Sequence, residues 1–125
     1  MPWFAIALGG AAGSVLRHAV GLWVQRGIPG FPWGTLVINI TGSGLLGFLA
    51  KALGSDTINP SFRAALTIGL CGGYTTFSTF SFETMRLIED GFAARAASYV
   101  IASTLLSVAA VFAGAALARG VVGPR

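Results

Sequence analysis

The sequence predicts an all-α membrane protein with four transmembrane helices, the third of which is broken near its middle. Composition is the first indication, because 54% of the 125 residues are hydrophobic and only 10% are charged, whereas soluble domains contain about 25% charged residues. The second is that the apolar residues form four long runs, unlike the ~10-residue alternating segments of a membrane β-barrel. We therefore expect one transmembrane domain over residues 1–125, embedded in a lipid bilayer.

The four expected spans follow from the length of helix that crosses a bilayer, about 20 predominantly apolar residues. The first covers residues 3–24 and ends before RGIPGFP, whose prolines and glycines stop a helix. The second covers residues 33–53 and ends at the polar segment GSDTINPS. The third covers residues 62–88 and has the segment GGYTTFSTFSFE, residues 72–83, at its centre, and the fourth covers residues 94–118.

The segment GGYTT, residues 72–76, predicts the break in the third span. It joins two glycines to two β-branched threonines, all of them weak helix formers. Non-helical backbone at bilayer depth persists only where it is buried in protein or lines a cavity. The carbonyl oxygens that such a break frees are suitable ligands for a hard cation such as Na⁺.

Basic residues are divided evenly between the two sides of the predicted membrane domain. The side with both termini carries Lys51, Arg63, Arg119 and Arg125, and the opposite side carries Arg17, Arg26, Arg86 and Arg95. Because an excess of Lys and Arg normally fixes the cytoplasmic side, this tie predicts insertion in both orientations and hence an antiparallel, dual-topology homodimer. The basic residues are also scattered singly along the chain, a pattern that argues against nucleic-acid binding. Gly9 and Gly13 allow close helix approach, either within the chain or between two subunits.

Polar residues recur every four positions in the second and fourth spans, so each set shares one helix face. The sets are Thr35, Asn39 and Ser43, and Tyr99, Ser103 and Ser107. An amide in an apolar helix must find hydrogen-bond partners, because an unmade hydrogen bond in hydrocarbon is costly. The two sets predict a polar pathway. The alternative is that the hydroxyls bond back to their own helices.

Two phenylalanines follow the break at a spacing that turns both toward the same side of a helix. They are Phe77 and Phe80, and Ser81 lies beside them as a further candidate pore residue. A phenyl ring has a positive edge and a negative face, so edges toward a pathway favour a small anion and faces favour a cation. Rings that face lipid or the core are equally compatible with the spacing. Glu83 is a candidate proton site, but its closeness to Arg86 and the membrane edge favours a structural carboxylate.

At these residues the sequence resembles the Fluc-type (CrcB-type) fluoride channel family of small four-helix membrane proteins. The resemblance rests on GGYTTFSTFSFE in the third span, GTLVINITGSGLLGF in the second and GGAAGSVLRH in the first, and it covers nearly the whole chain. It implies an antiparallel dual-topology homodimer with two pores in the cell (inner) membrane. It also implies passive export of fluoride from the cytoplasm, with no enzyme activity.

The resemblance further implies roles for individual residues. It places Phe77 and Phe80, one from each subunit, along each pore with their ring edges toward fluoride, together with Asn39, Tyr99, Ser103 and Ser107. Gly72 and Thr75 match the positions whose backbone carbonyls hold a structural Na⁺ at the dimer interface. Arg17 matches a vestibule arginine. Tyr74 departs from the family pattern, which usually has an aliphatic or phenyl residue at that position.

Other transport functions remain open at the level of the sequence. A small four-helix, proton-coupled antiporter for cationic drugs needs a deep carboxylate, and the first two spans contain no acidic residue, which leaves only Glu83. A proton-coupled fluoride carrier would respond to a pH gradient, whereas a channel would discharge fluoride down its own gradient. A third alternative is a non-transporting assembly subunit, but that function would leave the two polar sets unexplained.

Overall fold

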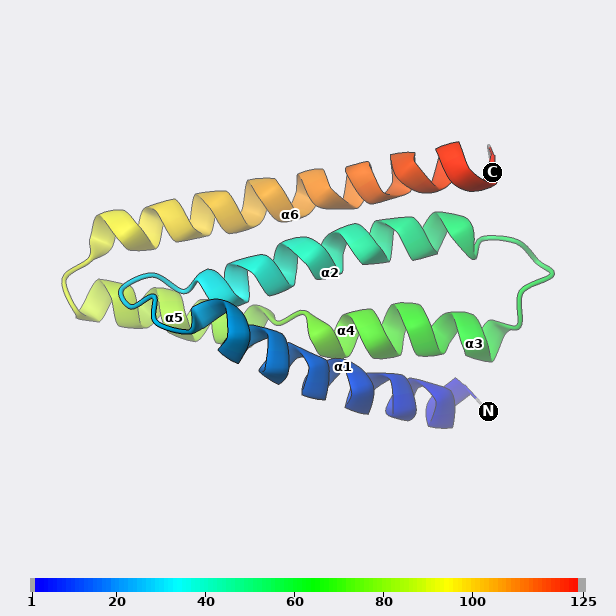
Figure 1. Ribbon diagram of the computed structural model, residues 1–125, viewed down its shortest axis with the longest axis horizontal. Helices are drawn as coiled ribbons and strands as arrows, with labels where there is room; N and C mark the ends of the chain where they lie inside the picture. Colours follow the sequence, from blue (N-terminus) through cyan, green and yellow to red (C-terminus); the bar gives the residue numbers. More distant parts are fainter. Residues whose placement is uncertain (1, 124–125) are drawn as a thin grey trace.

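The structure is a computed structural model that describes residues 2–123, and every regular element in that range is a helix (Figure 1). The elements are α1 (Pro2–Gln25), α2 (Trp33–Ala52), α3 (Pro60–Ala64), the π-helical segment η1 (Ala65–Cys71), α4 (Gly72–Tyr74), α5 (Phe77–Glu89) and α6 (Ala93–Val122). Three of these helices, α1, α2 and α6, are each long and apolar enough to cross a membrane. The all-helical prediction is thus confirmed for the described residues.

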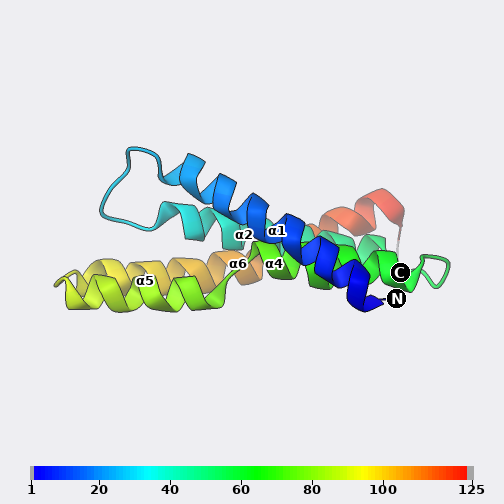
Figure 2. The ribbon, with the colours of Figure 1, turned by 90° about the horizontal axis from the view of Figure 1, so that it is seen from below.

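The long helices lie side by side as an elongated bundle in which α1 crosses the other helices obliquely (Figures 1 and 2). Helix α1 begins and α6 ends at the same end of the bundle, where the loop between α2 and α3 also lies. The loops at residues 26–32 and 90–92 lie at the opposite end. This arrangement places Lys51, Arg63 and Arg119 toward one end and Arg26, Arg86 and Arg95 toward the other, as expected. Arg17 lies beside the break instead, and Arg125 lies outside the described residues.

The break in the third expected span lies slightly later in the chain than the glycines suggested. Helices α3, η1 and α4 form one continuous rod over residues 60–74, and Gly72 is still helical, with φ −64° and ψ −39°. Extended backbone is confined to Thr75 (φ −81°, ψ 158°) and Thr76 (φ −151°, ψ 120°). The predicted break within residues 72–76 is therefore confirmed, and it lies at the two threonines while the two glycines stay helical.

Close packing against α1 explains why this rod contains glycine. A Cβ atom on Gly73 would lie 2.6 Å from the carbonyl oxygen of Gly10, and one on Gly13 would lie 2.8 Å from the backbone nitrogen of Tyr74. The backbones of α1 and of the rod are thus too close for a side chain between them. Gly9 also packs against this rod. The small residues of the first span therefore serve contacts within the chain.

The outer surface of the bundle is strongly apolar. Trp3, Trp23 and Phe112 are between 70% and 80% exposed, and they lie on the two outermost helices, α1 and α6. Soluble monomers rarely expose contiguous apolar surface on this scale, and a lipid bilayer removes it from water. The interior is small, and its largest fully buried side chain is Tyr99.

Candidate ion pathway

A pocket of about 320 Å³ lies beside the break, between α2, α5 and α6. We name two sets of residues by their helices: the α2 stripe is Thr35, Asn39 and Ser43, and the α6 stripe is Tyr99, Ser103 and Ser107. Each stripe contributes two residues to the pocket. The lining residues are Asn39, Ser43, Thr75, Thr76, Phe77, Phe80, Ser103, Thr104, Ser107 and Val108. The fold thus brings both stripes and both phenylalanines to one place.

Asn39 holds the extended backbone of the break. Its side-chain oxygen Oδ1 accepts a hydrogen bond from the Thr76 backbone N–H at 2.9 Å, and its Nδ2 donates to the Thr76 carbonyl at 3.1 Å. One amide side chain therefore satisfies both backbone groups of a residue that has left the helix. Because an amide nitrogen carries two N–H donors, Asn39 retains one donor for the pocket that it lines.

The two serines of the α6 stripe offer free donors. Ser103 and Ser107 each have a buried hydroxyl oxygen without a hydrogen-bond partner among the described residues. A helical serine can bond back to a carbonyl of its own helix, and Ser81 does so, donating to the Phe77 carbonyl at 2.9 Å. The absence of such a bond at Ser103 and Ser107 favours a role toward a ligand, because an unpaired buried hydroxyl is costly.

Helix α5 begins at the pocket. Its first residue, Phe77, follows Thr76, whose side-chain oxygen accepts a hydrogen bond from the Thr79 backbone N–H at 3.2 Å. This cap satisfies one of the four N–H groups that lack a helical partner at an N-terminus. The N-terminal end of a helix carries a positive partial charge and attracts anions. Both the α6 hydroxyls and this helix end are therefore suited to a negative ion.

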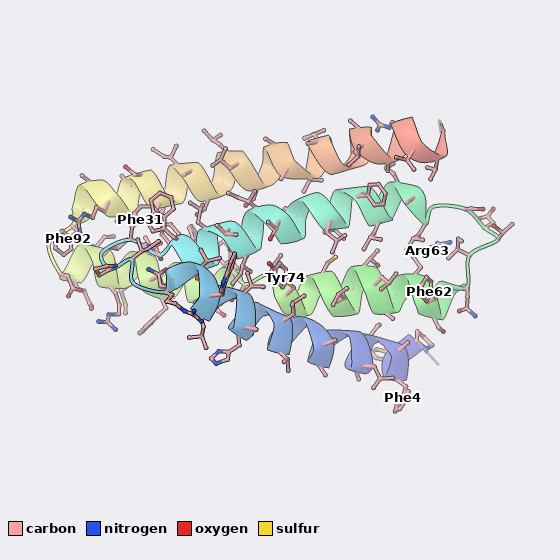
Figure 3. The ribbon with its side chains drawn as sticks, in the orientation of Figure 1. Phe4, Phe31, Phe62, Arg63, Tyr74 and Phe92 are labelled. Atoms are coloured by element: carbon pink, nitrogen blue, oxygen red, sulfur yellow. The ribbon has the colours of Figure 1, made fainter. Side chains whose placement is uncertain are left out.

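A chain of aromatic rings leads from the pocket toward one end of the bundle. The ring centroids of Phe77 and Phe80 are 5.5 Å apart, and those of Phe80 and Tyr99 are 5.0 Å apart. Tyr99 in turn meets Phe31 edge to face at 5.5 Å, and Phe31 lies close to the start of α6 (Figure 3). Phe77 is 79% exposed, so the pocket has one wall on the outside of the chain.

Tyr99 connects α6 to α5 beyond the pocket instead of lining it. Its side chain has no exposed surface, and its hydroxyl donates to Oε1 of Glu83 at 3.1 Å. Glu83 therefore has a partner on a neighbouring helix, which the sequence spacing of sixteen residues could not reveal.

Arg17 is half-buried beside the break. Its Nη1 donates to the Thr75 carbonyl at 3.4 Å, so this residue is not at the end of α1. A second pocket, of about 420 Å³, brings Arg17 and Glu83 together with Thr35 of the α2 stripe. Opposite charges thus share one cavity next to the first.

The two carbonyls predicted to hold a cation differ in their surroundings. The Thr75 carbonyl accepts the bond from Arg17. The Thr76 N–H, which in a continuous helix would bond to the Gly72 carbonyl, instead bonds to Asn39. Gly72 is exposed, and a Cβ atom there would meet nothing within 4 Å. Carbonyl oxygens are ligands of a type that suits Na⁺; the Gly72 carbonyl has lost its helical donor, whereas the Thr75 carbonyl already accepts the bond from Arg17.

Sequence reasoning included some residues that lie outside the first pocket and omitted others that line it. Ser81 and Tyr99 do not line the pocket, whereas Thr76 and Thr104 do. Ser43 also lines it, as its four-residue spacing from Asn39 predicted. The role of Thr76 depends on where the helix breaks, and no local pattern specifies that residue.

Comparison with known proteins identifies the family to which this chain belongs. The family model described as "CrcB-like protein, Camphor Resistance (CrcB)" matches residues 4–115. A protein of Rhizobium meliloti named "Fluoride-specific ion channel FluC" is 50% identical over 119 residues, covering 94% of this chain and 95% of the relative. Proteins with the same name from Nitrobacter winogradskyi (49% over 124 residues, covering 95% and 98%) and Anaeromyxobacter dehalogenans (42% over 120 residues, covering 94% and 95%) are also similar.

These findings confirm the resemblance that the third-span motif indicated. Together with the apolar helices, they make the protein a multi-pass membrane protein. Since the family model covers most of its length and the relatives are similar over nearly all of it, the chain belongs to the CrcB-like protein family.

Proposed function

We propose that the chain forms a fluoride-selective ion channel. The observation that carries the proposal is the pair of buried, unpartnered hydroxyls of Ser103 and Ser107 in a pocket that also contains the N-terminus of α5. Fluoride is small and strongly hydrated, so a pore must replace its water with close donors, and neutral donors do this without trapping the ion. The names of the relatives support the choice of fluoride.

The remaining pore residues supply further weak contacts. Asn39 offers its second amide N–H, and Phe77 and Phe80 offer the positive edges of their rings. Tyr99 continues the track toward the end of the bundle, and Ser81 stays a candidate that only a second subunit could bring to the pore. Arg17 attracts anions into the adjoining pocket, which serves as a vestibule.

The functional unit is an antiparallel, dual-topology homodimer with two pores. Its subunits each have four spans, namely α1, α2, α6 and a broken third span over residues 60–89. The exposed wall at Phe77 supports the need for a second copy to close each pathway. Since Arg17 lies beside the break and not at a membrane edge, the basic residues number four on one side and three on the other, which is still close to a tie.

A structural Na⁺ lies at the dimer interface in this proposal. Bound there, it would supply a positive charge that holds the carbonyl-rich ends of two broken helices together. The Gly72 and Thr75 carbonyls of both subunits are its ligands, supported by the loss of the helical donor at Gly72.

Fluoride leaves the cytoplasm passively through the inner membrane. The process involves no covalent chemistry, and the relatives are named as ion channels. The alternative is proton-coupled transport, either of fluoride or of cationic drugs. The half-buried Glu83, hydrogen-bonded to Tyr99 in a pocket with Arg17, is the observation that favours it.

Efflux from liposomes tests the proposal directly. Purified protein is reconstituted with internal fluoride or internal chloride, and release is followed with ion-selective electrodes. A channel should discharge fluoride at a high rate at equal pH on both sides and should exclude chloride. Equal release of the two ions would refute the selectivity. Fluoride movement driven by an imposed pH gradient would favour the coupled carrier.

A further inference from the structure

Tyr74 makes a contact that the proposed pore does not use. Its hydroxyl lies 2.9 Å from the side-chain oxygen of Thr41 on α2, and its side chain is only 8% exposed. Figure 3 shows Tyr74 near the middle of the bundle, between α2 and α4. A Cβ atom on Gly42 would lie 2.8 Å from the Tyr74 ring, so the missing side chain of Gly42 leaves the ring its place.

The direction of this hydrogen bond follows from the other contacts of Thr41. The Thr41 hydroxyl already donates to the Val37 carbonyl of its own helix at 2.7 Å. A hydroxyl has one proton and two acceptor lone pairs, so Thr41 accepts and Tyr74 donates. Removing the Tyr74 hydroxyl therefore leaves Thr41 with its bond to Val37, whereas removing the Thr41 hydroxyl leaves the Tyr74 hydroxyl without this acceptor.

Helix α2 thus holds the chain both before the break and within it. Thr41 binds Tyr74, the last helical residue before the break, and Asn39 binds Thr76, the second residue of the break. The last carbonyls of a helix lack helical donors and depend on other contacts for their orientation. Gly72 lies only two residues before Tyr74, in the same final turn. A tether on Tyr74 therefore limits how far the Gly72 carbonyl can turn.

We infer that the Tyr74–Thr41 hydrogen bond positions the open carbonyl of Gly72, which makes Tyr74 a positioning residue for the proposed cation site. The inference rests on the proposed function because it presupposes that Na⁺ binds at the break. Tyr74 is not itself a ligand, and its hydroxyl acts through the orientation of α4.

The test measures the thermal stability of the purified protein at increasing Na⁺, with the total salt held constant by an organic cation. The resulting curve gives the Na⁺ concentration for half-maximal stabilisation. Tyr74→Phe should raise this concentration about fivefold. Such a change corresponds to about 1 kcal/mol, the contribution of one hydrogen bond. Without Na⁺ the melting temperature should fall by only about 4 °C, the effect of one lost hydrogen bond. At saturating Na⁺, fluoride efflux and its selectivity over chloride should return to normal.

A double-mutant cycle with Thr41→Val separates a tether from a direct contact with the cation. If the hydroxyl acts only through Thr41, Tyr74→Phe should add no further Na⁺ shift in a Thr41→Val background. Thr67→Val is the matched control, because the Thr67 hydroxyl lies in the same rod and donates to the Arg63 carbonyl of that rod at 2.9 Å. This control should keep the wild-type Na⁺ requirement.

Three results would overturn the inference. A wild-type Na⁺ requirement in Tyr74→Phe would refute the positioning role of Tyr74 but would leave the proposed channel function unaffected. An equal, additive shift in the Thr41→Val background would mean that the hydroxyl acts on the cation directly. If the melting temperature of the wild-type protein does not depend on Na⁺, both the cation site and the positioning role of Tyr74 are refuted. Fluoride efflux would still test the pore separately.

Discussion

The α2 stripe and the α6 stripe have the same four-residue spacing but different hydrogen bonding. In the α2 stripe, Asn39 uses its oxygen and one N–H to hold Thr76. In the α6 stripe, the hydroxyls of Ser103 and Ser107 have no partner among the described residues. The difference shows that a polar stripe in a membrane helix can either hold another segment of backbone or offer its donors to a ligand.

The cause of this difference is what the individual side chains meet. Asn39 meets the break, where Thr76 presents a backbone N–H and carbonyl that have lost their helical partners. Ser103 and Ser107 line the pocket beside the first turn of α5, whose cap already satisfies Thr79. Variants that remove one function and spare the other can test this division.

The largest effect is expected for Asn39→Leu. Leucine has a similar size, but it leaves both backbone groups of Thr76 without a partner, at about 1–3 kcal/mol for each buried group. We expect a marked fall in melting temperature and loss of fluoride efflux, measured by thermal unfolding in detergent and by liposome release. Ser43→Ala is the matched control on the same stripe and should keep the wild-type melting temperature. A stable Asn39→Leu protein would show that the break forms without this amide.

Phe80→Ile should have the next largest effect. Phe80 lines the pocket and packs on Tyr99, so isoleucine removes a ring edge that the ion would meet. We expect fluoride efflux to fall about a hundredfold, corresponding to about 2.7 kcal/mol on the permeation barrier, while the elution volume in size-exclusion chromatography stays that of the wild type. Phe77→Ile should act in the same direction. Unchanged efflux in both variants would refute the pore assignment.

Replacing both serines of the α6 stripe should slow the ion without weakening the fold. In Ser103→Ala/Ser107→Ala we expect efflux to fall about tenfold, the effect of about 1.4 kcal/mol on the barrier. Melting temperature should not fall, because the change removes unpaired buried hydroxyls. This result is the opposite of that for Asn39→Leu. A clear loss of stability would indicate that these hydroxyls have structural partners.

The smallest effect is expected for Ser81→Ala. The Ser81 hydroxyl donates to the Phe77 carbonyl and does not line the pocket. We expect efflux within about twofold of the wild type, since such back-bonding contributes little to helix stability. A fall in efflux as large as that of the α6 double variant would indicate that Ser81 lines the pore through contact with a second subunit.

The helical class and the positions of the long apolar segments could be predicted from the sequence, because they depend on local composition and on the cost of unpaired backbone in lipid. The two stripes followed in the same way from helical periodicity. The family followed from the motif at residues 72–83, since that combination of glycines, threonines and phenylalanines is specific. These features need no knowledge of which helix packs on which.

Tertiary structure decided where the third span breaks and which polar groups stay free. The glycines remain helical because Gly73 packs on Gly10, and the chain leaves the helix at Thr75 and Thr76, where Asn39 can pair the freed backbone. Local propensity could not choose between these positions, because their energies differ through contacts with residues more than thirty positions away. The same long-range contacts give Asn39 its partners and leave Ser103 and Ser107 without any among the described residues.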